Sequence, residues 1–116
     1  MRNTLNYIDN KLNIALPVLE SKLKQLFGDK LRKIILYGSY ASGNYDIESD
    51  VDILAIINDK NFGRYNRELS KIELELFNEY GFLFSIIPEN EDYFLKNSDL
   101  LPFFRNVSAE GVIVYG

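Results

Sequence analysis

Two short polar motifs, each joined to an apolar strand, constrain this chain more than any other feature. Residues 33–37 are predicted to form a strand that ends at Gly38 and Ser39. After a spacer of ten residues, Asp50 and Asp52 introduce a second apolar strand. Because side chains two residues apart on a strand point to the same side, the two carboxylates should lie on one face of the sheet.

The carboxylate pair predicts a bound cation. Two like charges roughly 5 Å apart repel by about 3 kcal/mol at an effective dielectric constant of about 20. A buried strand that begins with such a pair needs a positive charge to neutralise it. Ligation by oxygen alone suits a hard ion that keeps some of its waters, so we expect Asp50 and Asp52 to hold Mg²⁺.

The turn after the first strand predicts a phosphate-binding site. Gly38 lets the backbone turn sharply and approach a ligand, and Ser39 can cap a following helix whose free N–H groups favour phosphate. A phosphate-binding turn that faces a metal-binding carboxylate pair is the smallest set of groups that nucleotidyl or phosphoryl transfer requires. Each motif alone is also typical of an ordinary turn or a polar strand entrance. The hypothesis therefore rests on their combination and spacing.

These residues resemble the signature of the nucleotidyltransferase superfamily typified by DNA polymerase beta, which pairs Gly-Ser with Asp-x-Asp. The short chain is similar to the minimal nucleotidyltransferases of prokaryotes, and its tail is similar to the subgroup that acts as antitoxin beside a HEPN-domain ribonuclease toxin. The tail features are Ser85 in a strand, Pro102-Phe103, Asn106-Val107 and Glu110-Gly111-Val112. The resemblance implies Asp50 and Asp52 as catalytic, Mg²⁺-binding residues and Gly38-Ser39 as ligands of ATP. It further implies that AMP is transferred to a tyrosine of the toxin, which would silence the ribonuclease.

Two positions depart from the pattern of this superfamily. Tyr40 stands where many relatives carry Arg after the Gly-Ser pair, and Ser85 stands where the third acidic residue is expected. A serine is neutral and cannot act as a general base near neutral pH. Three alternatives follow: catalysis with a water-mediated base, weak or lost activity, or recruitment of Glu89, Glu91 or Asp92. Tyr40 or Tyr45 is an alternative stacking partner for the base, whereas Asp46 and Glu48 are predicted to lie on a solvated loop.

Composition excludes several other kinds of protein. The 116 residues include no histidine and no cysteine, which excludes the usual catalytic triads, thiolate chemistry and most zinc sites. A hydrophobic fraction of 47% excludes disorder. No apolar run approaches the ~20 residues of a membrane span, and the first residues lack a signal peptide, so we expect a cytoplasmic protein. The net charge of −4 argues against long nucleic acid as a partner and suits a basic protein.

The remaining patterns predict an α/β (α+β) fold of the polymerase-beta-like kind, a small mixed sheet of about four strands flanked by helices. We expect one domain, with a helical segment at 1–28 and a transferase core at 30–116. Apolar residues from 5 to 26 recur at helical spacing, and Pro17 makes this either a kinked helix or two helices. Residues 1–16 could also present a surface to a partner helix. Further elements are a strand at 50–57, a helix at 63–80, a strand at 82–87 closed by Pro88, helices at 90–97 and 100–107, and an edge strand at 112–115.

The leading hypothesis is a nucleotidyltransferase antitoxin that modifies its toxin. A module that neutralises the toxin by contact, with a vestigial site, is the alternative that Ser85 motivates. Transfer to a small molecule, as in aminoglycoside-modifying enzymes, fits less well because no second domain encloses a substrate. Phe103 and Phe104 are predicted to close the core, and an exposed ring at either position would indicate a partner contact. A homo-oligomer remains open.

Overall fold

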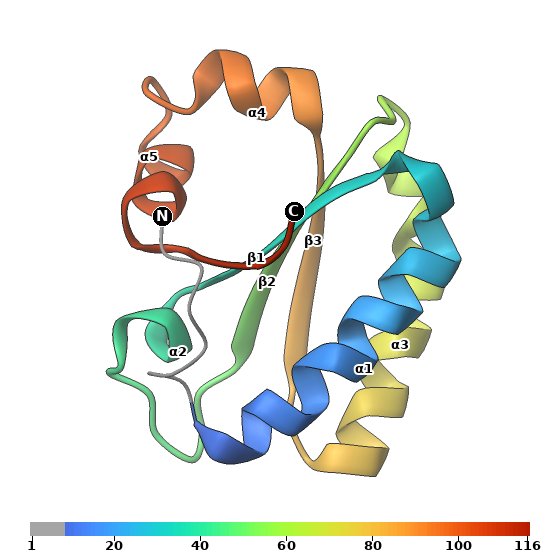
Figure 1. The fold of residues 1–116 in the computed structure, drawn as a ribbon, viewed down its shortest axis with the longest axis vertical. Coiled ribbons are helices and arrows are strands. Elements are labelled where there is room, and N and C mark those ends of the chain that lie inside the picture. The colour runs from blue at the N-terminus through green and yellow to red at the C-terminus, as the bar shows by residue number, and fades with distance from the viewer. Residues whose placement is uncertain (1–8) are drawn as a thin grey trace.

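The computed structural model describes residues 9–116 (Figure 1). Four strands form one mixed sheet in the order β3-β2-β1-β4, which confirms the predicted fold class. The strands are β1 (Leu31–Tyr37), β2 (Val51–Ile57), β3 (Phe84–Asn90) and β4 (Val112–Tyr115). β1 runs antiparallel to both β2 and β4, whereas β3 runs parallel to β2. β4 is an edge strand, as predicted.

Helices cover both faces of the sheet (Figure 1). The helices are α1 (Asn10–Phe27), the short α2 (Ser39–Ser42), α3 (Asn66–Tyr80), α4 (Glu91–Asn97) and α5 (Pro102–Glu110). Alternate residues of the strands point to opposite faces. Ile34 and Ile53 therefore join the large core under α1 and α3, whereas Ile35 and Leu54 join a smaller core under α4 and α5.

α1 is one continuous helix, so the alternative of two helices is wrong. Asp9 caps it, because its Oδ1 accepts hydrogen bonds from the backbone N–H groups of Lys11 (2.8 Å) and Leu12 (3.2 Å). Pro17 lies inside the helix on its exposed side. The carbonyl that loses its hydrogen bond to proline can there bond to water, which makes the interruption tolerable. The predicted apolar positions 5 and 8 lie outside the described residues.

β3 departs from its predicted boundaries because it runs through Pro88 to Asn90. Pro88 pairs with Ala55 of β2 in the ladder. Since β3 is an edge strand, the missing N–H of proline can lie on the side that has no neighbouring strand. The prediction that Pro88 closes the strand was therefore wrong. Smaller differences occur in α5, which begins at Pro102 and ends three residues beyond the predicted end, and in α3, which follows a 3₁₀ turn at Phe62–Tyr65.

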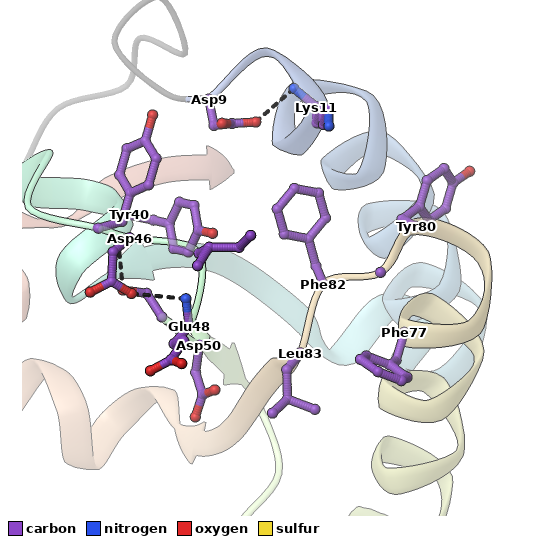
Figure 2. A pocket seen from close by; sticks show the side chains of 14 residues that line it. Asp9, Lys11, Tyr40, Asp46, Glu48, Asp50, Phe77, Tyr80, Phe82 and Leu83 are labelled. Carbon is purple, nitrogen blue, oxygen red and sulfur yellow. Dashed lines mark hydrogen bonds between the residues drawn. The ribbon is translucent and has the colours of Figure 1, made fainter.

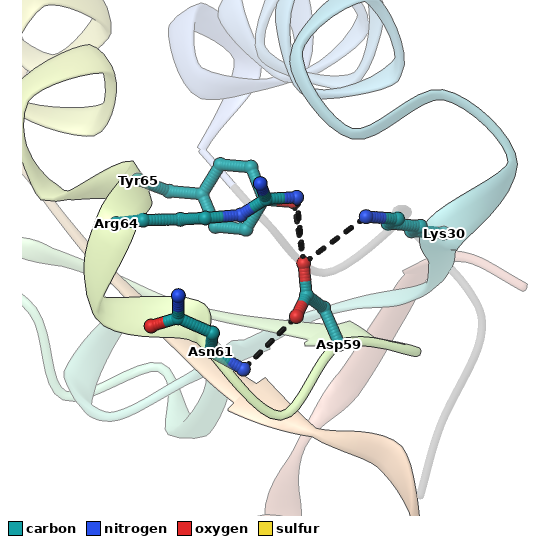
Figure 3. Close-up of polar contacts among 5 residues, drawn as sticks. All are labelled: Lys30, Asp59, Asn61, Arg64 and Tyr65. Carbon is teal, nitrogen blue, oxygen red and sulfur yellow. Dashed lines mark hydrogen bonds and ion pairs between the residues drawn. The ribbon is translucent and has the colours of Figure 1, made fainter.

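Asp59, just beyond the end of β2, ties three segments together (Figure 3). Its carboxylate accepts hydrogen bonds from the Tyr65 hydroxyl (2.7 Å), Nη2 of Arg64 (3.0 Å), Nζ of Lys30 (3.2 Å) and the backbone N–H of Asn61 (2.9 Å). The Tyr65 hydrogen bond is the largest of several influences that lower the pKa of Asp59 far below its usual range. This cluster fixes the loop after β2 against the start of β1.

No helix within residues 9–116 is both long and apolar enough to cross a membrane.

Candidate functional site

The turn after β1 lies directly against β2, the strand that carries Asp52. Gly38 has φ +77°, a backbone conformation that glycine adopts without strain. A Cβ atom at position 38 would collide with Oδ2 of Asp52. α2 begins at the next residue, Ser39, and its first turn folds back on the Gly38 carbonyl, which accepts from the N–H groups of Ala41 and Ser42 at 3.1 Å. The predicted turn and the predicted carboxylate therefore converge.

Asp52 is the second residue of β2, a central strand of the sheet, and the residues opposite it on β1 and β3 define its surroundings. Tyr37 of β1 and Ser85 of β3 are the residues opposite it, and paired residues project to the same face. Partial burial and the neighbouring charge of Asp50 raise the pKa of Asp52. Burial, with a smaller effect of Asp52, raises the pKa of Tyr37 to about 12. The site thus holds a carboxylate that would be stabilised by a nearby positive charge.

Asp50 is the exposed member of the pair, one residue before β2. The adjacent N–H of Val51 donates to the carbonyl of Leu83 at 2.9 Å, which anchors this strand entrance to the start of β3. The repulsion between the two aspartates is the interaction that the sequence predicted. The structure therefore brings Gly38, Ser39, Asp50 and Asp52 to one end of the sheet.

The donor set at this end fits a magnesium ion. Neither Asp50 nor Asp52 forms an ion pair with a Lys or Arg within residues 9–116. No group of three or more His, Cys, Asp or Glu side chains suited to a metal occurs in the same range. Two carboxylates are nevertheless a usual protein contribution to a Mg²⁺ site, because Mg²⁺ keeps several waters and takes phosphate oxygens from its substrate.

The acidic residues that could replace a third carboxylate lie at the other end of β3. Glu89 pairs with Ile56, four residues along the strand from Ser85 or about 13 Å away. Glu89 also accepts a hydrogen bond from the N–H of Asn90 at 2.9 Å, and Glu91 forms an ion pair with Arg32 at 3.5 Å. Asp92 follows in α4. Recruitment of these residues is therefore not supported, and the position opposite Asp52 remains a serine.

Tyr40 is a core residue and not a stacking platform for a base. Its side chain is buried and stacks on Tyr45, with ring centroids 4.4 Å apart and planes 11° apart. Its other neighbour is Phe82, whose ring lies edge-on at 6.1 Å. The residue that replaces the arginine of many relatives thus fixes the spacer onto the main core. Asp46 and Glu48 are exposed, as predicted, and Asp46 closes its own turn by accepting from the N–H of Glu48 at 2.8 Å.

The two adjacent phenylalanines of α5 differ in their exposure. Phe104 is buried, whereas Phe103 is 41% exposed. The Phe103 ring lies edge-on to Tyr37 at 5.2 Å, which places it beside the residue opposite Asp52. Of the two adjacent phenylalanines, one therefore closes the core and the other lines the site. Sequence alone could not separate them, because both fit an amphipathic helix.

A cleft of about 590 Å³ adjoins the site at Asp50 (Figure 2). Its walls come from the start of α1, from α2, from the loop before β2, from the end of α3 and from the residues that join α3 to β3. Nothing in the sequence pattern predicted this cleft, since segments far apart in the chain form it.

Comparisons with known proteins identify the family of this chain. The family described as "Nucleotidyltransferase domain" matches residues 16–111. A protein of Methanocaldococcus jannaschii named "Putative protein adenylyltransferase" is 38% identical over 101 residues, which cover 87% of this chain and 95% of that protein.

Two solved structures share the fold. One holds a tri-AMPylated HEPN toxin of Shewanella oneidensis in complex with an MNT antitoxin, with TM-score 0.54, 18% identity and coverage of 90% of this chain and 71% of the matched chain. The other is described as a toxin-antitoxin with AMP-PNP, with TM-score 0.55, 20% identity and coverage of 93% and 74%.

Proposed function

Because the chain belongs to the nucleotidyltransferase domain family, we propose that it transfers AMP from ATP to a hydroxyl group of another protein. The name of the relative in M. jannaschii supports adenylyl transfer to protein. The single observation that carries the proposal is the contact between Gly38 and Asp52, because a phosphate-binding turn and a metal-binding carboxylate must meet for this chemistry.

Each site residue has a role in the proposed reaction. Asp50 and Asp52 would hold Mg²⁺, which would supply positive charge to the phosphate oxygens. Gly38 and Ser39 bind the β- and γ-phosphates through the turn and the start of α2.

The transfer itself exchanges one P–O bond for another. The acceptor oxygen forms a bond to the α-phosphorus, the bond from that phosphorus to the bridging oxygen breaks, and pyrophosphate leaves with the bonding electrons. The proton of the acceptor hydroxyl passes to solvent water, since Ser85 cannot take it.

We further propose that the acceptor is a tyrosine of a HEPN-domain toxin and that the modification, an AMPylation, makes this chain an antitoxin. The two structural neighbours are toxin–antitoxin complexes, and one of them contains an AMPylated toxin. An acidic chain of net charge −4 is suited to a basic protein partner.

The test combines the purified chain, Mg²⁺, ATP labelled at the α-phosphate and a candidate HEPN-domain protein from the same genome. We expect label on the HEPN protein, located to a tyrosine by mass spectrometry. Asp50→Asn and Asp52→Asn should each lose transfer, whereas Asp29→Asn, an exposed acidic position before β1 at the other end of the sheet, should retain it. Transfer that survives both site variants would refute the assignment.

A second function is favoured by the serine opposite Asp52. A chain that lacks a third carboxylate could neutralise the toxin by contact alone. In that case Asp52→Asn would still protect cells that express the toxin, although it transfers no label. Loss of protection in this variant, at unchanged protein level, would rule out the contact-only function.

A further inference from the structure

The cleft beside Asp50 has apolar walls that face solvent. Phe77 at the end of α3 is 47% exposed and Leu83 before β3 is 53% exposed, and both line the cleft (Figure 2). Ile47 of the loop, 99% exposed, lines it as well. Tyr45 and Phe82 form its inner part, where they pack against the core. Large apolar side chains gathered in one concave region indicate a binding surface.

Within residues 9–116, the charges around this cleft are mostly negative. Asp9, Asp46, Glu48 and Asp50 line it, and Lys11 is the one cationic residue among the lining residues of this range. None of these five side chains forms an ion pair with another described residue, although five ion pairs occur elsewhere between residues 20 and 91. The hydrogen bonds of Asp9 go to backbone N–H groups at the positive end of α1, and Asp46 accepts from the N–H of Glu48 and from the hydroxyl of Ser49. These bonds fix both carboxylates, and neither Asp46 nor Glu48 has an ion-pair partner within residues 9–116.

We propose that this cleft docks the protein that accepts the nucleotide, through a segment in which an aromatic or large aliphatic side chain is flanked by Lys or Arg. The apolar side chain would enter between Phe77, Leu83 and Tyr45, and the flanking cations would lie against the acidic rim. The identity of the docked protein as acceptor rests on the proposed function. Asp50 belongs to both the cleft and the phosphate-transfer site, so a segment bound here lies beside the reacting centre.

The same charges argue against the other classes of ligand. Nucleic acids and anionic membranes present phosphates, which the carboxylates of Asp46 and Glu48 would repel.

Two synthetic peptides of equal length separate charge from hydrophobicity. Both carry a central tyrosine, which Lys flanks in one peptide and Glu in the other. Titration of the isotope-labelled chain, followed by NMR without ATP, should move the amide signals of Ile47 and Leu83 with the Lys peptide only. Glu48→Lys should lower the affinity for the Lys peptide by about fivefold, which is the upper limit for one exposed ion pair. Glu110→Lys, an exposed position at the end of α5 outside the cleft, should change its affinity less than twofold.

The apolar wall is tested on α3, where two exposed residues differ in their position relative to the cleft. Phe77 lines the cleft, whereas Leu74, 60% exposed, does not. Phe77→Ser should raise the KM for the protein acceptor and leave the Kd for AMP-PNP unchanged, and Leu74→Ser should change neither.

These readouts distinguish the docking site from the proposed reaction. Binding of the Lys peptide to a wild-type chain that transfers no label would refute the reaction and retain the docking site. Equal binding of the two peptides, or an unchanged KM in both Glu48→Lys and Phe77→Ser, would overturn the docking proposal even if transfer occurs.

Discussion

An aspartate lies at each end of strand β2, and the two side chains have opposite surroundings. Asp59, just beyond the end, accepts hydrogen bonds from Tyr65, Arg64, Lys30 and Asn61, and its pKa is lowered. Asp52, at the start, is partly buried beside the like charge of Asp50, and its pKa is raised. The fold supplies hydrogen-bond donors to the first carboxylate, whereas the second forms no ion pair within residues 9–116 and would be stabilised by a cation. This difference distinguishes a structural residue from a candidate site residue of the same type.

The largest expected effect comes from removing the charge of Asp52. Asp52→Asn should lower the rate of adenylyl transfer by about a hundredfold or more, as loss of a group that stabilises charge in the transition state does. The same variant should raise the unfolding temperature at neutral pH without Mg²⁺, because ionisation of a group with a raised pKa opposes folding. A label-transfer assay and a thermal unfolding curve measure the two quantities. A variant that loses activity and stability together would indicate that Asp52 is structural.

The next effect concerns the turn that contacts Asp52. Gly38→Ala and Gly43→Ala place a side chain at similar positive φ angles, +77° and +87°, so each should lower the free energy of unfolding by about 1–3 kcal/mol. Only the Cβ at position 38 meets Asp52, since position 43 has no atom within 4 Å of a built Cβ. We therefore expect Gly38→Ala alone to lose AMP-PNP binding, as measured by calorimetry. Equal loss of binding in both variants would show that the contact with Asp52 is irrelevant.

At the other end of β2, Asp59→Asn should change the pH dependence of stability. A carboxylate whose folded pKa is lowered stabilises the fold above its unfolded pKa, which is about 4, and that stabilisation is lost as the pH falls below it. The wild-type chain should therefore lose stability more steeply with acid than Asp59→Asn, which is less stable at neutral pH. Urea unfolding at several pH values measures this slope. Identical slopes would mean that the hydrogen bonds to Asp59 do not persist in solution.

The sequence predicted that Gly38, Asp50 and Asp52 lie together at the start of β2, but it did not predict the hydrogen bonds around Asp59 at the other end. The difference has a physical reason. Gly38, Asp50 and Asp52 belong to two adjacent strands, so the ten-residue spacer and the alternation of side chains place them together. The partners of Asp59 come from a 3₁₀ turn and from the residue before β1, and no local period links them. The cleft beside Asp50 was missed for the same reason. Pro88 was misjudged because the edge position of β3 depends on the whole sheet.

The smallest expected effect is the response to Mg²⁺. A ligand that binds only the folded chain stabilises it by RT ln(1 + [L]/Kd), or about 1 kcal/mol when free Mg²⁺ is five times its Kd. We expect wild type and Asp59→Asn to gain this increment in a thermal unfolding assay and to lose it when a chelator is added. Asp52→Asn should gain nothing, because one of the two carboxylates that would share the ion is missing. A gain of equal size in all three proteins would place the ion away from Asp52, and the contrast between the two ends of β2 would then have to be explained without a metal.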